Sequence, residues 1–261
     1  MFDVVILAGG VNPKFADPTR CGATLEALVD IDGRPMIAYV TSALARCPEI
    51  DRIFVAGPAA ELQGCALGAK VTVVEGGDTI FATAENGLAM IADDRLTLVA
   101  TADIPLLTPA AVSDFLQQAA ALEAEFCYPI VTKETCESQF AGVKRTYVRL
   151  KEGTFTGGNL FLVRPSVIKR CRVAAEQIIV RRKAPLALCR LLGWRFVFGL
   201  LMGRLELADL EKRVSSLLSL HGRVLVSRYA EIGLDVDKPS DLALVRQAAR
   251  RLRASDSPYT G

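Results

Sequence analysis

Residues 2–10 read FDVVILAGG, and in this stretch a run of apolar side chains ends directly on two glycines. Apolar runs of this length that are bounded by glycine indicate a buried strand, here Val4–Leu7. Gly9 and Gly10 would let the backbone approach a bulky ligand and adopt dihedral angles that a side chain forbids. The polar loop that continues to Leu25 therefore predicts a ligand-binding turn, with an ordinary turn as the alternative. The loop is not a P-loop, because it contains neither GK[ST] nor G-x-G-x-x-G.

Similar runs recur along the first half of the chain and alternate with segments of helical periodicity. Alternating strands and helices predict βαβ units and a mainly parallel sheet. Because the runs are continuously apolar, we expect helices on both faces and thus an α/β fold. Apolar runs lie at Ile53–Ala56, Val71–Val74, Leu96–Ala100 and Phe126–Ile130, and the helical segments are Met36–Ala45, 80–92 and Ala110–Leu122.

The rest of the chain predicts one domain with an insertion. We expect a single domain over residues 1–252, a helical insertion at 165–220, and a polar, flexible tail at 253–261. The apolar stretch Ala184–Gly203 contains two arginines, which are costly inside a bilayer, so we expect it not to span a membrane. The stretch also has aromatic residues beside a basic segment, namely Trp194, Phe196 and Phe198. A membrane-surface patch or a dimer face is therefore an alternative for this stretch.

Charge and cysteine content narrow the class of partner. The chain of 261 residues has 31 Lys and Arg against 29 Asp and Glu, so a net charge of +2 argues against nucleic acid. The segment from Arg164 to Arg195 is nevertheless basic, with Glu176 as its one acid. The seven cysteines form no CxxC pair and no signal peptide is visible, which favours reduced thiols and a cytoplasmic protein.

Acidic residues at two strand ends suggest a metal site. Asp103 comes three positions after the end of the apolar run 96–100, at the strand end where open α/β sheets bind ligands. Mg²⁺ is commonly bound by one or two carboxylates together with substrate phosphates, and a loop-stabilising acid is the alternative. Near the other end of the chain, a short strand expected at Ile232–Leu234 leads to Asp235 and Asp237. Because these two alternate along the chain, we expect one to reach the metal and the other to brace the loop.

Four motifs in order carry a resemblance to a known family. LAGG (7–10), GRPMI (33–37), DIPLL (103–107) and DVDKPSDL (235–242) follow one another along the chain. In this order of motifs the chain resembles the nucleotidyltransferases of the nucleotide-diphospho-sugar transferase fold, in particular MobA-like and cytidylyltransferase-like proteins. The resemblance covers residues 3 to about 130 and 222–250, and the segment VKRTYVRLKEGTFTGGNLFLV resembles a branch without an assigned substrate. It implies a three-layer α/β/α, GT-A-like fold with a mixed, mainly parallel sheet.

The resemblance also implies roles for individual residues. Asp103 would bind Mg²⁺ that bridges the donor phosphates, and Asp237 would be the second carboxylate. An acceptor phosphate or hydroxyl would attack the α-phosphorus of a nucleoside triphosphate (NTP) and release pyrophosphate. The backbone of Leu7, Ala8, Gly9 and Gly10 would hold the nucleotide, and Gly157, Gly158 and Asn159 would face the acceptor.

One position departs from the family pattern. A lysine is usual before the AL that precedes GRPM, and this chain has Glu26 there. A glutamate would repel phosphate, at a cost of several kcal/mol in a partly buried site. Lys14 and Arg20 in the same loop, or Arg34, are the candidate replacements, and the first two are our candidate catalytic cations.

Two further segments complete the candidate site. The loop with Gly76 and Gly77, together with Asn86, is expected to contact the nucleotide. The region 144–195 is expected to bind a small anionic acceptor, with Arg145 and Lys151 as its candidate residues.

Two alternative functions stay open at this point. One is a glycosyltransferase that uses a nucleotide sugar, with the D-x-D segment 235–237 on the metal. The other is a nucleotide-binding module that has lost catalysis with the lysine. The sequence does not indicate the base or the oligomeric state.

Overall fold

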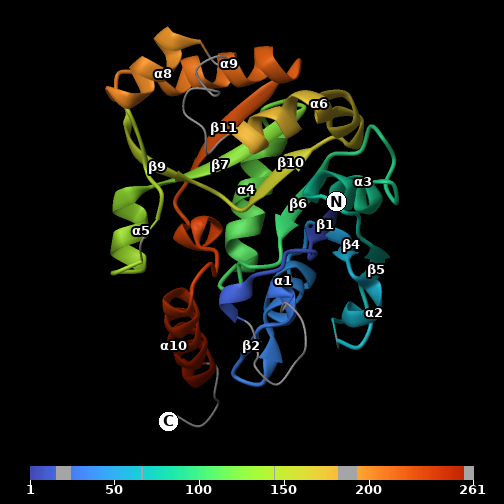
Figure 1. Ribbon diagram of the computed structural model, residues 1–261. Coiled ribbons are helices and arrows are strands. Elements are labelled where there is room, and N and C mark those ends of the chain that lie inside the picture. Colours follow the sequence, from blue (N-terminus) through green and yellow to red (C-terminus); the bar gives the residue numbers. More distant parts are fainter. Residues whose placement is uncertain (16–24, 66, 144, 182–192, 256–261) are drawn as a thin grey trace.

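The computed structural model describes residues 1–15, 25–65, 67–143, 145–181 and 193–255. Within these ranges nine strands form the main sheet, in the order β5-β4-β1-β6-β10-β7-β9-β8, and β11 pairs with β7 (Figure 1). The strands are β1 (Phe2–Leu7), β4 (Ile50–Gly57), β5 (Val71–Glu75), β6 (Thr97–Thr101), β7 (Phe126–Thr132), β8 (Val148–Leu150), β9 (Gly153–Gly157), β10 (Leu160–Val163) and β11 (Gly222–Ser227). A separate hairpin consists of β2 (Asp30–Ile31) and β3 (Arg34–Pro35).

The sheet is mixed and mainly parallel, as predicted. Strands β5, β4, β1 and β6 pair in parallel, and β10 runs antiparallel to both β6 and β7. A bend joins β9 to β10. Gly157 pairs with Ile130, whereas Leu162 pairs with Cys127, so five residues on this segment match three on β7. The bend at Gly158 and Asn159 accommodates the two extra residues, and Gly158 N still donates to Pro129 O of β7 at 2.9 Å.

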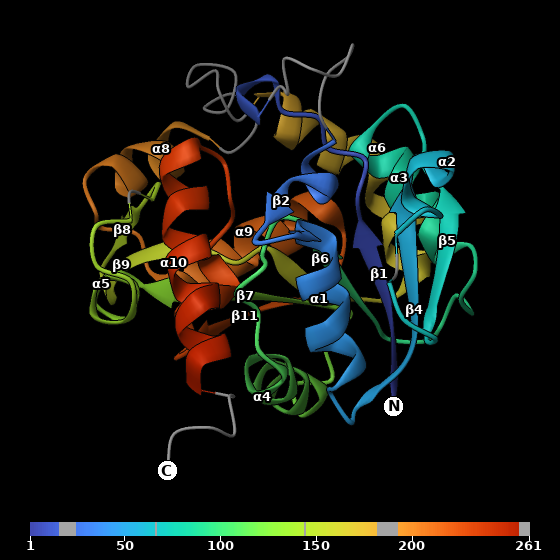
Figure 2. The same ribbon diagram turned by 90° about the horizontal axis from the view of Figure 1, so that it is seen from below.

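Helices cover both faces of the sheet because successive strand residues face opposite sides. On one face Val4 and Ile6 of β1 pack under α1 and α4, and on the other Val5 packs toward α3 and α6. Figure 1 and Figure 2 show α6 and α1 on opposite sides of the sheet. The helices are α1 (Met36–Ala45), α2 (Ala59–Leu62), α3 (Ile80–Leu88), α4 (Pro109–Ala120), α5 (Lys133–Gln139), α6 (Pro165–Arg181), α8 (Trp194–Leu201), α9 (Leu207–Leu218) and α10 (Pro239–Ser255).

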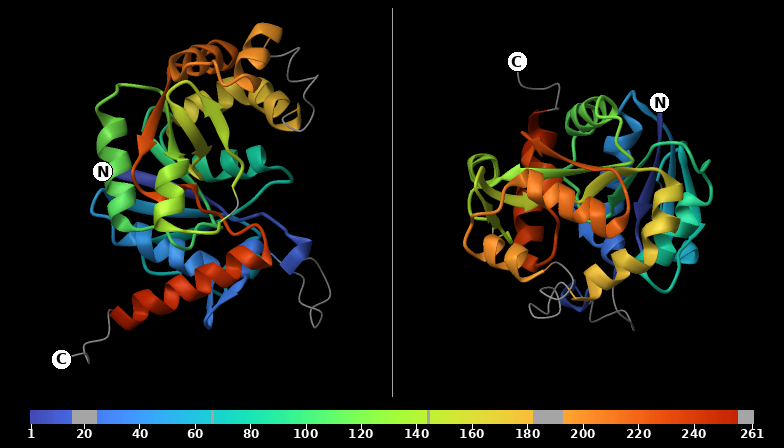
Figure 3. Two further views of the ribbon diagram at one scale, coloured as in Figure 1. Left: turned by 90° about the vertical axis from the view of Figure 1, so that its left-hand side faces the viewer. Right: turned by 90° about the horizontal axis from the view of Figure 1, so that it is seen from above.

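The described part of segment 165–220 is largely helical and consists of α6, α8 and α9 with their connections. The α8–α9 pair and α10 lie at opposite ends of the molecule (Figure 3). Helix α10 continues to Ser255, three residues into the segment predicted as a tail, and 256–261 lie outside the described residues. Within the described residues, no helix is long and apolar enough to cross a membrane, and residues 184–192 of the predicted apolar stretch lie outside them.

Helix α10 anchors the segment that carries Asp235 and Asp237. Its Leu242 and Val245 pack with Ile31 and Met36 in one buried cluster. The strand predicted at Ile232–Leu234 is wrong: residues Ala230–Gly233 form a 3-10 helix instead. The backbone after it lies beside the loop that follows β6, because Val236 N donates to Asp103 O at 2.9 Å.

Candidate active site

The turn after β1 is closed by backbone contacts. Gly10 O accepts a hydrogen bond from Glu26 N at 2.9 Å, and Val11 forms a β-bridge with Leu25. A Cβ atom on Gly10 would lie 2.6 Å from Glu26 Oε2. The glycine therefore allows the Glu26 carboxylate to lie directly against the turn.

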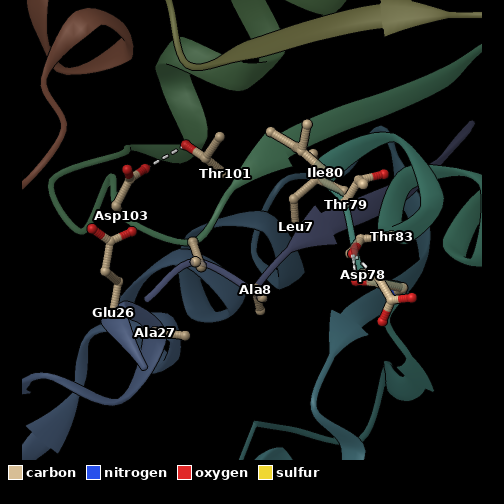
Figure 4. Close-up of a pocket in the computed structure, with 14 residues that line it drawn as sticks. Leu7, Ala8, Glu26, Ala27, Asp78, Thr79, Ile80, Thr83, Thr101 and Asp103 are labelled. Carbon is tan, nitrogen blue, oxygen red and sulfur yellow. Dashed lines mark hydrogen bonds between the residues drawn. The ribbon is translucent and has the colours of Figure 1, made fainter. Parts of the chain in front are cut away.

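A cavity of about 290 Å³ lies at the carboxyl ends of β1 and β6, where the topology places ligands. Six residues predicted to bind the donor line it: Leu7, Ala8, Gly9, Gly10, Gly77 and Asp103. The other residues that line it are Glu26, Ala27, Asp78, Thr79, Ile80, Thr83, Thr101 and Ala102 (Figure 4). Gly76 and Asn86 do not line it. The Asn86 amide donates to Glu75 O and Gly76 O at 3.1 Å each, so this side chain holds the turn beside the cavity.

Threonines shape the far end of the cavity. Thr79 is the N-cap of α3 and accepts from Ala82 N at 3.1 Å. Thr83 accepts from Gly77 N at 3.0 Å and donates to Gly77 O at 3.1 Å. We did not predict these two residues or Thr101 from the sequence. A threonine before a helical pattern is a recognisable N-cap signal, and it would have located Thr79.

Asp103 lies where the end of β6 meets the end of β1 and the bend at Asn159. Thr101 Oγ1 donates to its carboxylate at 2.5 Å, Ala102 N donates to Leu7 O at 3.2 Å, and Thr101 N donates to Asn159 O at 3.0 Å. Burial, together with the negative charges of Asp235 and Glu26, raises the pKa of Asp103 to about 6, against the opposing effect of the hydrogen bond from Thr101. An acid placed among other acids favours the binding of a cation.

Glu26 points its carboxylate toward Asp103 (Figure 4). Two of the cations that we expected to replace the lysine usual in the family, Lys14 and Arg34, are described, and neither lines this cavity. Lys14 Nζ instead donates to Asp237 O at 3.3 Å, and the Arg34 guanidinium stacks 4.9 Å from the Tyr39 ring. Arg20 lies outside the described residues.

A second cavity of about 370 Å³ contains most of the residues predicted for the acceptor. This cavity adjoins the first one. Asp235 and Asp237 line the second cavity, and Val236 between them donates its N–H to the backbone oxygen of Asp103, which lines the first. Its lining comprises Tyr128, Arg145, Thr146, Thr156, Gly157, Gly158, Asn159, Gly233, Asp235, Asp237, Lys238 and Asp241. Lys151 lines neither cavity, and its ammonium pairs with Glu206 at 2.6 Å.

The two late acids have different partners. Asp235 forms an ion pair with Arg145, which also donates to Asp235 O at 2.7 Å. The Arg145 side chain is only 7% exposed, and its Nε is buried without a hydrogen-bond partner. Asp237 is exposed, and among the described residues only its backbone is bonded, with Asn12, Lys14 and Asp241. Its carboxylate is therefore available to a ligand, whereas that of Asp235 braces the loop.

The described residues contain no group of three or more His, Cys, Asp or Glu side chains that could hold a metal ion. Mg²⁺ does not require such a group, because it commonly takes one or two carboxylates and completes its shell with water and phosphate oxygens. Asp103 and Asp237 fit this pattern: one carboxyl has a raised pKa, and the other has no partner within the described ranges.

The chain is similar to a family of known proteins and to solved structures. Residues 4–177 match the model of the MobA-like NTP transferase domain. A hypothetical transferase from Thermus thermophilus is 38% identical, with a TM-score of 0.81 over 92% of this chain and 99% of that chain. No curated protein matches the chain.

Two more distant structures share the fold alone. The CMP:2-keto-3-deoxy-manno-octonic acid synthetase complexed with CTP is 15% identical, with a TM-score of 0.63 over 97% of this chain and 100% of that chain. The 4-diphosphocytidyl-2C-methyl-D-erythritol synthase from Anaerococcus prevotii is 9% identical, with a TM-score of 0.57 over 96% and 98%.

Proposed function

Because the chain belongs to the family of MobA-like NTP transferase domains, we propose that it transfers a nucleoside monophosphate from an NTP to a small anionic acceptor and releases pyrophosphate. One observation carries the proposal: a glycine-walled cavity and a second, polar cavity adjoin at Asp103. Two substrates in these cavities would present their reacting atoms to each other beside that carboxylate.

The donor would occupy the first cavity. Its phosphates would lie toward Asp103, and its base would lie toward Gly77, Thr79 and Thr83 at the other end. The backbone at Gly9 and Gly10 allows close approach, because neither residue carries a side chain. The hydrogen bonds of Thr83 to Gly77 support this assignment, since they hold the base-side wall in one conformation.

Asp103 and Asp237 would hold Mg²⁺, which would supply positive charge to the donor phosphates when bound. The ion pair between Arg145 and Asp235 supports Asp237 as the second ligand, because the Asp235 carboxylate is already engaged. With no described cation in the first cavity, this ion would provide most of the charge that neutralises the phosphates.

The chain's own contribution to the reaction would be positioning. An acceptor oxygen would attack the α-phosphorus, a new P–O bond would form, and the bond to the α–β bridging oxygen would break, so that pyrophosphate leaves. Arg145, through its unpartnered Nε, and Lys238 would orient the anionic group of the acceptor in the second cavity. Reacting groups held in alignment lower the entropic part of the barrier.

The contacts disfavour the first of the two alternatives, and a test of turnover separates the second from the proposal. A glycosyltransferase that binds its metal through both acids of D-x-D would need the Asp235 carboxylate, which is paired with Arg145. A module without catalysis would have kept the cavity while Glu26 repels the triphosphate.

Product analysis tests the proposal. The protein is incubated with each NTP, Mg²⁺ and a panel of sugar phosphates and sugar acids, and pyrophosphate is measured, with Asp103→Asn as the inactive control. Pyrophosphate from the wild type alone supports nucleotidyl transfer. Free nucleoside diphosphate from nucleotide sugars would instead indicate a glycosyltransferase.

A further inference from the structure

One face of α8 exposes large apolar side chains. Its Phe196 and Leu200 pack inward against a buried cluster that includes Leu150 and Phe155. The outer stripe, which we define as Trp194, Phe198, Leu201 and Met202, points the other way. Trp194, Phe198 and Leu201 are 66%, 61% and 79% exposed. Residues at this spacing share one face of a helix, and large contiguous apolar patches on a surface mark interaction sites.

Apolar surface continues beyond the helix. On the same face of the sheet, a groove of about 450 Å³ lies between α9 and the strands β7 and β11. Its apolar lining includes Phe126, Leu210, Val214 and Leu218. Leu210 also belongs to the cluster on which α8 packs, so the groove and α8 share one layer.

Two arginines border the outer stripe. Arg149 on β8 and Arg204 after α8 are exposed, and neither has an ion pair among the described residues. The stem of Arg149 lies beside the end of α8, because a Cβ on Gly203 would be 3.0 Å from its Cγ and Cδ. These two residues, the basic rim, therefore present positive charge next to the apolar stripe.

Two acids on the segment that follows α8 have partners other than the basic rim. Glu206 pairs with Lys151 at 2.6 Å, and Glu211 pairs with Arg223 at 3.4 Å. Glu211 also accepts from Val224 N at 2.6 Å. The partner of this surface should therefore combine apolar material with negative charge.

We propose that the outer stripe of α8 and the basic rim form a docking surface for an anionic phospholipid bilayer. A helix with Trp, Phe and Leu on one face lies in the interface of a bilayer with that face among the acyl chains. Arginines near the surface of an anionic leaflet add electrostatic attraction. A second copy of the chain fits less well, since a twofold axis through the patch would bring the two basic rims together.

The sequence offers a direct reporter of this surface. Trp194 is the single tryptophan in the chain, so intrinsic tryptophan fluorescence reports on the outer stripe alone. We would titrate the full chain with phosphatidylcholine vesicles and with vesicles that also contain phosphatidylglycerol, and measure co-sedimentation in parallel. We expect a blue shift and co-sedimentation with the anionic vesicles, both weakened as salt rises.

Variants separate the apolar and the charged contributions. Phe198→Ser with Leu201→Ser should weaken vesicle binding at least tenfold, because exposed apolar area no longer enters the bilayer. Arg149→Gln and Arg204→Gln should each weaken binding to anionic vesicles about fivefold. Met90→Ser, at an exposed apolar residue 49% exposed on another part of the surface, is the matched control and should bind as the wild type does. None of these residues lines either cavity, so nucleotide binding should be unchanged.

Three results would overturn the proposal. The first is the absence of binding to either type of vesicle. The second is equal binding to neutral and anionic vesicles, which would exclude the role of the basic rim. The third is a blue shift without lipid that grows with protein concentration together with a dimer mass in light scattering, which would identify a second copy as the partner.

Discussion

The Glu26 carboxylate points toward Asp103 in the first cavity, and the Asp103 carboxylate accepts a hydrogen bond from Thr101 Oγ1. Burial is the main cause of the raised pKa of Asp103, and the negative charge of Glu26 contributes to it. A carboxylate pair at this point makes the cavity unfavourable for free phosphates and favourable for phosphates that arrive with a divalent cation.

Removal of the Glu26 charge should strengthen nucleotide binding. Glu26→Gln keeps the size of the side chain and ends its repulsion of the triphosphate, so we expect NTP affinity to rise about tenfold or more at low salt. Calorimetric titration measures this. Glu61→Gln, an exposed glutamate that lines neither cavity, is the matched control. A fall in Mg²⁺-dependent affinity would show instead that Glu26 helps to hold the cation.

Asp103 should reduce the stability of the protein without ligands at neutral pH. Its pKa of about 6 in the folded state lies above the ordinary value, so the folded state binds its proton more tightly than the unfolded state. Stability is therefore lost as pH rises from about 4 to 6. Asp103→Asn should raise the free energy of unfolding by about 2 kcal/mol above pH 7 and by much less at pH 4, while abolishing turnover. Denaturant titration at both pH values measures this, and a variant less stable than the wild type at pH 7 contradicts it.

The two late acids should separate stability from activity. Asp237→Asn removes a carboxylate with no partner among the described residues, so we expect an unchanged melting temperature and loss of Mg²⁺-dependent turnover. Asp235→Asn leaves Arg145 without its ion pair and should destabilise the protein by about 1–3 kcal/mol. Thermal melts and pyrophosphate release on both variants test the assignment, and the opposite pattern would make Asp235 the metal ligand.

The bend at Gly157 should tolerate no side chain. A Cβ there would lie 2.3 Å from the Tyr128 hydroxyl, which donates to Gly158 O at 2.9 Å. Gly157→Ala should cost about 1–3 kcal/mol of stability. Adding Tyr128→Phe removes the clashing oxygen, so the double variant should be less destabilised than the sum of the two single changes. Additive effects in denaturant titrations would mean that the clash is relieved elsewhere.

The sequence predicted those parts of the site that depend on strand ends. An apolar run that ends on Gly9 and a second that ends before Asp103 located the first cavity, because strand topology places both at the same edge. The direction of the strand Leu160–Val163 could not be predicted, because an apolar run does not indicate which way its strand runs in the sheet. In the structure this strand, β10, is antiparallel to β6. The pairing of Arg145 with Asp235 joins residues 90 apart, which no local pattern indicates.

Lys151 shows the same limit for charged residues. Its alternation with apolar neighbours agrees with its position just after β8, but its partner Glu206 lies on a segment that packs nearby only in the folded chain. The threonines at 79, 83 and 101 resemble ordinary loop and strand residues in the sequence. Their hydrogen bonds give them their position in the site.

Thermal stabilisation by NTPs, with and without Mg²⁺, tests the central claim that the cavity over Gly9 and Gly10 binds the donor through a cation at Asp103. A ligand at 100 times its dissociation constant adds about 2.7 kcal/mol, which a melting curve resolves. We expect at least one NTP to raise the melting temperature of the wild type only when Mg²⁺ is present, and to have no effect on Asp103→Ala. An equal shift in both proteins, or no shift with any NTP, would contradict the donor site.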